Sequence, residues 1–362
     1  MVIFAETGAA PRFDSGFGRV IKWQDDLLEG FPYTLIEARE PNERPSAVKE
    51  VLNKFMPDAV YVHGYALNYL RQAMRWANQL KIPVLMTTDS ELRHPRPWHV
   101  RIAKRLMLPK ILRQVDMFLT VGDENERYFQ HYGVGADRFH RVPFSIDSAY
   151  YDKALLNQSE VRKSVRERLG LSPETVAILT VGKMIERKEH ASLVRAFGMA
   201  IQAANRPAVL LVAGDGPLRP QLEELAKPLN AAVRLLGFIG VEHLPEYYSA
   251  ADIYVHPSSH DPHPLAISEA LYCGLPVVVS DRIGSVGPTD DVQVGVNGWE
   301  YPIGEEESLS RILAHLIDHP EIRAESAVHS REIGLLHSSN RCAVRFVDGA
   351  LLAIERRQAK QN

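Results

Sequence analysis

Two series of short β-rich runs, each alternating with longer stretches of helical periodicity, constrain the fold of this chain more than any other feature. In the first series the expected strands are Val2–Ala5, Tyr33–Glu37, Ala59–His63, Pro83–Thr87, Met117–Val121 and Phe139–Val142. The helical stretches between them are Phe17–Leu28, Leu67–Leu80, Trp98–Arg113 and Glu124–Tyr132. Strands that alternate with helices are typical of βα units, so this half predicts one doubly wound α/β domain with a parallel sheet.

A second series of the same kind begins at Val176. Its expected strands are Val176–Val181, Ala208–Ala213, Val233–Leu236, Ile253–His256 and Pro276–Val279. Its helical stretches are Ala191–Ala203, Leu218–Ala226, Leu244–Ser249 and Ile267–Tyr272. From Glu306 onward only helical periodicity remains, ending in Arg341–Arg357.

A polar, charge-mixed segment at residues 148–172 separates the two series. A chain of 362 residues also exceeds one typical core, so two domains are expected. We predict an N-terminal domain over residues 1–160, a second domain over 161–338 and a terminal helix within 339–362.

The composition narrows the function classes. The net charge of −3 gives no reason to expect nucleic-acid binding. Cys273 and Cys342 are the only cysteines, which predicts no disulfide framework and favours a reducing, cytoplasmic location. No run approaches the ~18 apolar residues of a membrane span. We therefore expect a soluble protein that is at most peripheral to the inner face of a membrane.

The stretch from His256 to Asp281 combines a strand end, a polar loop, a short helix that opens at Pro264 and a second buried strand. Asp261 and Glu269 lie eight positions apart and place one carboxylate on each side of the helix start. Backbone N–H groups and the positive end of the helix dipole make such a start a natural phosphate site. A phosphate flanked by two carboxylates that accept hydroxyl hydrogen bonds suits a nucleotide-sugar.

Other polar residues follow expected strands, where open α/β sheets bind their ligands. Lys183 and Lys188 lie at a strand-to-helix turn, and cations are unfavourable at a helix N-terminus unless an anionic ligand is present. His63 and Asp89 follow consecutive strands and indicate a cleft, although a lone His of this kind is more often structural. Gly16 and Gly18 lie at the start of the expected helix Phe17–Leu28, where either a ligand approach or a plain tight turn explains them.

Two further patterns have weaker functional interpretations. His256, His260, Asp261 and His263 suggest a zinc site, but the loop is short and nothing nearby supplies a second shell, so a binding loop is favoured. No D-x-D pair is present. The segment Arg93–Arg113 is rich in Arg and Lys, lacks acids and carries apolar residues, which fits either contact with an anionic membrane or a partly solvated helix.

Several motifs of the second half, taken in order, resemble those of the group 1 glycosyltransferases, family 4 of the retaining enzymes. They are VGKMIERKEH, the GDGPL turn, LLGFIGVEHLPEYYSAADIYVHPS and an E-x7-E segment with the tail ALYCGLPVVVSD. The first half is similar more loosely, in VGDENERYFQHYGV followed by RVPFSID. The resemblance implies the GT-B fold, in which two Rossmann-like domains face a central cleft and a final helix crosses back onto the first domain.

The resemblance also implies roles for individual residues. Lys183 and Lys188 match the basic pair on the donor diphosphate, and Asp261 and Glu269 match the carboxylates that contact the sugar and the ribose. Phe238 and Ile239 lie in the turn that meets the base in the family. The same comparison places His63 and Asp89 on the acceptor side of the cleft, and it implies a UDP-sugar donor and no metal or other cofactor.

The chain departs from the family pattern near the transferred sugar. Lys183 replaces the usual Arg and keeps its charge without the bidentate fork. Asp261 is one methylene shorter than the usual Glu, and Asp89 stands where many members have His. His263-Pro264 replaces the usual Phe-Gly, and because proline has no N–H to donate, we expect the amides of Leu265 and Ala266 to hold the donor.

Together these features predict a retaining glycosyltransferase that moves a sugar to a hydroxyl of a glycan or a lipid-linked acceptor. A nucleotide-sugar-binding sensor or scaffold with a degenerate site, and a nucleotide-sugar epimerase, stay open as alternatives. A glycan phosphorylase would need a pyridoxal-phosphate lysine, of which there is no sign. The absence of a G-x-G-x-x-G turn disfavours a Rossmann oxidoreductase.

Overall fold

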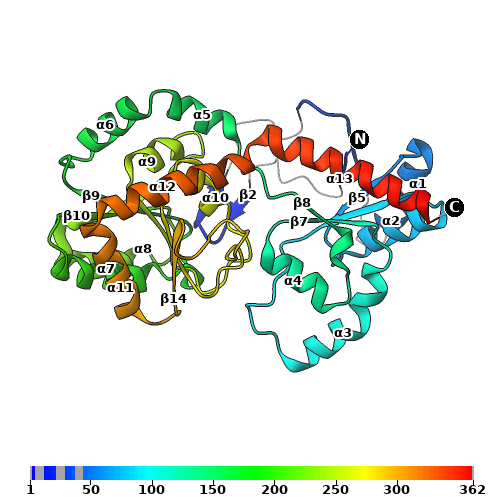
Figure 1. Ribbon diagram of the computed structural model, residues 1–362, viewed down its shortest axis with the longest axis horizontal. Helices are drawn as coiled ribbons and strands as arrows, with labels where there is room; N and C mark the ends of the chain where they lie inside the picture. Colours follow the sequence, from blue (N-terminus) through cyan, green and yellow to red (C-terminus); the bar gives the residue numbers. More distant parts are fainter. Residues whose placement is uncertain (1, 5–11, 22–28, 37–43, 361–362) are drawn as a thin grey trace.

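The computed structural model describes residues 2–4, 12–21, 29–36 and 44–360. It contains two parallel sheets that lie side by side (Figure 1). The N-terminal sheet has the order β5-β6-β7-β8, formed by Val60–His63, Val84–Thr87, Met117–Thr120 and Phe139–Arg141. The C-terminal sheet has the order β11-β10-β9-β12-β13-β14, and its strands in chain order from β9 are Val176–Val181, Ala208–Ala213, Val233–Gly237, Ile253–His256, Val277–Ser280 and Gly298–Tyr301. The predicted α/β class with two Rossmann-like sheets is confirmed.

The strands of the C-terminal sheet are buried on both faces, as β9 shows. Ala177 and Leu179 belong to one hydrophobic cluster and Val176 and Ile178 to another, because successive side chains of a strand point to opposite faces. One face is covered by α7 (His190–Ala203), α8 (Arg219–Ala226) and α11 (Glu306–Asp318). The other is covered by α9 (Leu244–Ala250) and α10 (Leu265–Tyr272), with α12 (Pro320–Gly334) packed on α10.

The N-terminal sheet has one face under four helices. These are α1 (Arg44–Phe55), α2 (Asn68–Gln79), α3 (Trp98–Leu112) and α4 (Asp123–His131). In α2 the buried residues Ala73, Met74, Trp76 and Ala77 recur at helical spacing. Short 3-10 segments lie at Ala136–Arg138, Glu186–Lys188, Lys227–Ala232 and Leu335–His337.

The charge-mixed segment between the two series is helical, which the sequence pattern did not predict. It forms α5 (Ser148–Leu156) and α6 (Gln158–Arg168). Arg162 and Arg166 anchor α6 through Asp252, with N–O distances of 2.6 and 3.3 Å, and through backbone carbonyls at the end of α9. The charges of this segment thus bind it to the C-terminal sheet.

The N-terminal prediction is wrong in one element. The expected helix Phe17–Leu28 is a strand over Arg19–Ile21 (β3), which pairs antiparallel with Arg12–Asp14 (β2), and residues 22–28 lie outside the described part. The carboxylate of Asp14 accepts hydrogen bonds from the N–H groups of Gly16 and Phe17, and Gly18 has φ +65°, so a hairpin turn forms instead of a helix start. Gly16 and Gly18 therefore lie in the turn between β2 and β3.

Two other predicted strands pair apart from the main sheet. Val2–Phe4 (β1) and Tyr33–Leu35 (β4) form a parallel two-stranded sheet of their own. The neighbouring positions Ala5 and Glu37, which were predicted as strand ends, lie outside the described residues.

The chain passes between the two sheets at two adjacent places. Ile146 N–H donates to His337 O (3.0 Å), and Ser339 Oγ donates to Ile146 O (2.9 Å). After this crossing α13 (Ser339–Ala359), the red helix of Figure 1, returns to the N-terminal sheet. There it covers the face opposite α1–α4, where Ala353 packs with Leu85 and Leu119. The predicted domain limits at residues 160 and 338 stay predictions.

The packing of α13 on the N-terminal sheet can be tested at Gly349. A Cβ there would lie 2.6 Å from Leu119 Cδ2 and 3.0 Å from His140 Cδ2, so Gly349→Leu overpacks this contact. We expect the free energy of unfolding to fall by about 1–3 kcal/mol in urea denaturation. Asp348→Ala, on the exposed side of the same helix, is the control and should change it by no more than about 0.5 kcal/mol. Equal stability of the two variants would contradict the close packing.

Candidate active site

The centre of the site is a chain of side chains that joins the loops after two adjacent strands. Lys188 follows β9, His256 ends β12, and Asp261 lies in the loop between β12 and α10. Lys188 Nζ lies 2.5 Å from Asp261 Oδ2, and His256 Nε2 lies 3.1 Å from the same oxygen. Because β9 and β12 are parallel neighbours, their carboxyl ends bring these residues together.

The charge state of this cluster follows from burial and hydrogen bonds. Burial alone would raise the pKa of Asp261, but the hydrogen bond from His256 and the positive charge of Lys188 hold it well below its usual range. Burial lowers the pKa of His256, which favours the neutral ring. A neutral ring satisfies both contacts if Nε2–H donates to Asp261 and Nδ1 accepts from Tyr254 OH at 3.1 Å. The site therefore holds an ionised carboxylate beside a lysine at neutral pH.

Lys183, the second predicted cation, is bound from the N-terminal hairpin. Its Nζ lies 2.6 Å from Asp14 Oδ2 and 4.9 Å from the centre of the Phe17 ring. The hydrogen bond from Lys183 lowers the pKa of Asp14. A Cβ on Gly16 would lie 2.6 Å from Lys183 Cδ, so the hairpin turn approaches this lysine closely. Gly16, the first of the two predicted glycines, is thus near the site, although it lies in a turn. Gly18 is the residue of this turn with a positive φ.

A cavity of about 600 Å³ lies between this hairpin and the ends of β9, β10 and β11. Phe238 and Ile239, which the resemblance assigns to the base-binding turn, line this cavity. The Phe17 ring meets the Phe238 ring edge-on at 5.2 Å, and the Arg19 guanidinium lies 4.6 Å from the Phe238 centre. Phe17 and Arg19 were not predicted as site residues, because their segment has a helix-like pattern.

The GDGPL turn beside this cavity has a structural role. A Cβ on Gly214, which has φ +141°, would lie 1.9 Å from the carbonyl oxygen of Gly182. Only a glycine allows the two loops to come this close. The turn after β10 thus fixes the position of the Gly182–Lys183 backbone.

The helix start predicted to hold phosphate is α10. Its first residue, Leu265, is exposed, Ala266 is half-buried, and Pro264 precedes them as the N-cap. The first N–H groups of a helix have no acceptor within the helix, so those of Leu265 and Ala266 can donate to an anion. His263 is buried instead, with Nε2 at 3.4 Å from Asp291 and its ring edge-on to Phe144 at 5.6 Å.

Glu269 lies within α10 and is bound by a tyrosine that the sequence analysis missed. Tyr248 OH donates to Glu269 Oε2 at 2.8 Å and also approaches the carbonyl of Ala266. Burial raises the pKa of Glu269 to about 7, against the hydrogen bonds from Tyr248 and Tyr151. Both tyrosines come from hydrophobic helices, α9 and α5, and nothing in their spacing distinguished them from core residues.

His63 and Asp89, the predicted acceptor-side residues, lie apart from the Lys188–Asp261 contact. His63 ends β5, and its ring stacks on Phe144 at 6.3 Å in a cavity of about 370 Å³ that also contacts α13. Asp89 is exposed after β6. Burial lowers the pKa of His263, and the charges of Asp291 and Asp89 oppose this effect, so Asp89 lies near His263.

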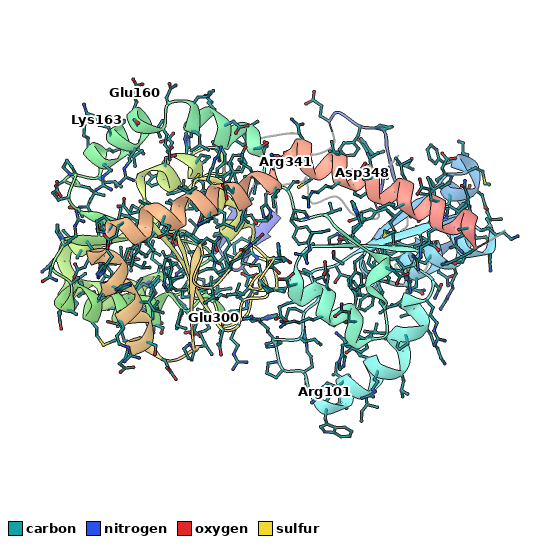
Figure 2. All side chains as sticks on the ribbon, viewed as in Figure 1. Arg101, Glu160, Lys163, Glu300, Arg341 and Asp348 are labelled. Atoms are coloured by element: carbon teal, nitrogen blue, oxygen red, sulfur yellow. The ribbon has the colours of Figure 1, made fainter. Side chains whose placement is uncertain are left out.

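Ionic contacts join the two halves around the site. Arg93, in the loop before α3, pairs with Glu300 of β14 and with Glu124 at 3.3 Å. Figure 2 shows Glu300 on the side of the C-terminal half that faces the other sheet. Arg141 donates to the carbonyl of Thr289 at 2.9 Å, and Asp290 accepts from the N–H of Asp123 at the start of α4 at 2.5 Å.

The structure separates the residues of the weaker zinc interpretation. His256 bonds Asp261, while His260 stacks on His94 with ring centres 4.1 Å apart. Within the described part of the chain, one group has metal-ligand geometry: His263, Asp290 and Asp291 each place one atom within 4.8 Å of the others. His337 and Ser268 already bond Asp291, and Asp123 bonds Asp290, so this group forms part of the contact between the halves.

Two family descriptions match the chain. "Glycosyl transferases group 1" matches residues 175–319, and "Glycosyl transferase 4-like domain" matches residues 5–145. The chain belongs to the group 1 glycosyltransferases. No helix among the described residues is both long and apolar enough to span a bilayer.

The chain is similar to curated enzymes over part of its length. A GDP-mannose-dependent monoacylated alpha-(1-6)-phosphatidylinositol monomannoside mannosyltransferase of Corynebacterium glutamicum is 26% identical over 66% of this chain and 62% of its own. A D-inositol 3-phosphate glycosyltransferase of Xylanimonas cellulosilytica is 30% identical over 66% of this chain and 57% of its own. The chain therefore spans less than two thirds of these relatives.

Solved structures show the same fold at low identity. A glycosyltransferase of Rickettsia africae superposes with a TM-score of 0.69 at 16% identity, covering 89% of this chain and 85% of its own. Anabaena Alr3699/HepE in complex with UDP gives 0.68 at 18% identity, covering 88% and 85%. These likenesses establish the GT-B fold.

The raised pKa of Glu269 predicts a pH-dependent stability. The folded carboxyl holds its proton up to about pH 7, whereas the unfolded value is 4.5, so its stabilising contribution is full below pH 4.5 and is lost as the pH rises through 7. Relative to Glu269→Gln, the wild type should lose about 1–2 kcal/mol of unfolding free energy between about pH 5 and 8, since partial contact with solvent reduces the effect. Urea unfolding at a series of pH values measures this, and parallel curves would contradict it.

The Lys183–Asp14 contact predicts competition with an anionic ligand. If a diphosphate binds Lys183, it must displace Asp14, so Asp14→Asn should tighten UDP binding. The pair is about one-third exposed, so we expect a change of about two- to five-fold in calorimetric titration. Glu223→Gln, which removes an exposed partner of Arg219, serves as the control. Weaker UDP binding in Asp14→Asn would instead mean that Asp14 positions Lys183 for the ligand.

Proposed function

We propose that this protein is a retaining glycosyltransferase that transfers a sugar from a UDP-sugar to a hydroxyl of a glycan or lipid-linked acceptor. The observation that carries the proposal is the contact of Lys188 with Asp261 at the carboxyl ends of adjacent strands, beside the start of α10. A lysine, an ionised carboxylate and open helix N–H groups are the partners that a diphosphate and a sugar hydroxyl require.

The donor would lie across the C-terminal half. Its base would enter the cavity at Phe238 and Ile239, and its ribose would bond Glu269, which loses its proton near pH 7. The diphosphate would bind Lys183, Lys188 and the N–H groups of Leu265 and Ala266. Lys188 is already placed against Asp261, so the same carboxylate can orient the transferred sugar.

In the reaction, the bond between the anomeric carbon and the diphosphate oxygen breaks as the acceptor oxygen bonds the same face of that carbon. The acceptor proton passes to the departing diphosphate. Lys183 and Lys188 stabilise the negative charge that develops on the leaving group, which is where fixed cations contribute most to rate. The two lysines supply this charge without a metal ion. His63 and Asp89 would position the acceptor from the N-terminal side.

The names of similar proteins support a nucleotide-sugar donor and a lipid-linked acceptor. Alr3699/HepE is in complex with UDP, whereas the Corynebacterium relative is GDP-mannose-dependent. An alpha-monoglucosyldiacylglycerol synthase of Streptococcus pneumoniae is 23% identical over 85% of this chain and 70% of its own. A role in glycolipid or polysaccharide biosynthesis, in the cytoplasm where we place the protein, fits these partners.

A sensor or scaffold that binds a nucleotide-sugar without transferring it is the second candidate. Its support is the buried His263 and the proline at the N-cap of α10, which alter the donor loop. A transferase slowly hydrolyses the donor without acceptor, and a pure binder does not.

Turnover of a Lys188→Ala variant tests the proposal. If Lys188 acts on the leaving diphosphate, kcat for UDP-sugar hydrolysis or transfer should fall by about two or more orders of magnitude. Asp261 keeps its hydrogen bond from His256 in this variant, and circular dichroism verifies the fold. Lys227→Ala, at an exposed pair of the same half, is the control. A kcat like that of the wild type would reject the assignment.

A further inference from the structure

Helix α3 presents a row of large apolar side chains to solvent. Trp98, Ile102 and Leu106 recur every four residues, and their exposed fractions are 72%, 52% and 71%. Residues at this spacing share one side of a helix. The opposite side is buried through Leu108 and Leu112, so the helix is anchored to the sheet while the row stays exposed. Contiguous exposed apolar surface of this kind marks an interaction site.

The charges around this row are all of one sign. Arg101, Arg105, Lys110 and Arg113 are exposed on α3 and at its end, and no Asp or Glu occurs from residue 93 to residue 113. The whole chain carries a net charge of −3, so the positive charge is a local feature. Figure 2 shows Arg101 at the lower edge of the molecule. Apolar side chains framed by cations complement an anionic lipid surface.

A second exposed apolar row, on α13, lacks this complementarity. Val344, Val347 and Leu351 are 54–62% exposed, but the charges of this helix are mixed. The exposed acids Asp348 and Glu355 lie on it together with the arginines Arg341, Arg345, Arg356 and Arg357. Arg341 and Asp348 of α13 lie on the side of the molecule opposite Arg101 (Figure 2). Charge thus distinguishes α3 from the other exposed helix.

A cavity of about 490 Å³ lies beside α3. Trp98, Arg101 and Ile102 line it together with Tyr128 of α4, to which Lys104 Nζ donates at 3.3 Å. His94 lines the same cavity.

His94 connects this cavity with the donor side. Its ring stacks on His260 at 4.1 Å, and His260 is the residue before Asp261. A residue that lines the α3 cavity is therefore in direct contact with the residue that precedes the donor carboxylate.

We propose that α3 docks the protein on an anionic membrane and that the cavity beneath it receives the polar head group of a lipid acceptor. The apolar row enters the lipid, and the arginines bind lipid phosphates at the surface. The acceptor half of this inference rests on the proposed transferase function, whereas the docking half does not.

Vesicle flotation at low salt tests the docking. The wild type should bind vesicles of phosphatidylcholine mixed with phosphatidylglycerol and should not bind phosphatidylcholine alone. The double variants Trp98→Ser/Leu106→Ser and Arg101→Glu/Arg105→Glu should each lose at least about ten-fold in binding, since each removes one part of the surface. Arg341→Glu/Val344→Ser makes matched changes on α13 and should bind like the wild type.

The outcomes separate the docking from the proposed function. Any of three results would overturn the docking. They are failure of the wild type to bind phosphatidylglycerol vesicles, binding of these vesicles by the α3 variants as by the wild type, and a loss of vesicle binding in the α13 variant as large as in the α3 variants. Thermal unfolding of each variant distinguishes lost docking from lost folding. UDP binding by the wild type without vesicles tests the donor site alone, so absent UDP binding with intact vesicle binding would reject the proposed UDP-sugar donor and keep the docking.

Discussion

The ion pair between Lys188 and Asp261 is the interaction on which the arrangement of the site depends. Both side chains are 14% exposed, and His256 also binds the Asp261 carboxylate oxygen that Lys188 contacts. Removal of one partner of a buried pair leaves an uncompensated charge, which costs about 3–5 kcal/mol. The pair therefore holds the loop after β9 against the loop before α10, and only a sheet in which β9 and β12 are parallel neighbours brings these loops together. The open start of α10 lies beside them as a consequence.

The second constraint is the set of contacts that holds the two halves of the molecule together. Arg93, Arg141 and Asp290 form contacts across the boundary, and Asp14 reaches Lys183 from the N-terminal hairpin. Lys183, one of the residues predicted to bind phosphate, is thus already paired with the carboxylate of Asp14. Binding of an anion at Lys183 exchanges one partner for another, so the hairpin and the ligand are linked in free energy. Phe17 and Arg19 belong to the same hairpin and line the cavity at Phe238, so one segment contacts both this cavity and Lys183.

The sequence predicted the parts of the fold that have strong periodicity. All eleven expected strands overlap strands of the two parallel sheets or of the pair β1–β4. Lys183, Lys188 and Asp261 could be placed because they lie in the loops that follow such strands. The hairpin was missed because Phe17, Val20 and Ile21 also fit helical spacing, and the turn depends on the Asp14 side chain. Tyr248, which bonds Glu269, could not be found because its hydroxyl role depends on tertiary contact. His263 was expected beside the donor, yet its side chain is buried against Asp291 and Phe144. This burial depends on contacts between segments that are distant in the sequence, which no local pattern encodes.

The central claim is that Lys183, Lys188 and the start of α10 form a site for a nucleotide-sugar. Thermal unfolding of the wild type with UDP-glucose, UDP-galactose, UDP-N-acetylglucosamine and GDP-mannose tests it most directly. A ligand at a hundred times its dissociation constant stabilises the folded protein by about 2.7 kcal/mol, which raises the unfolding midpoint measurably. We expect at least one UDP-sugar to raise the midpoint of the wild type and to have little effect on Lys183→Ala. If no member of the panel raises the midpoint of the wild type, the site does not bind nucleotide-sugars and the account is wrong.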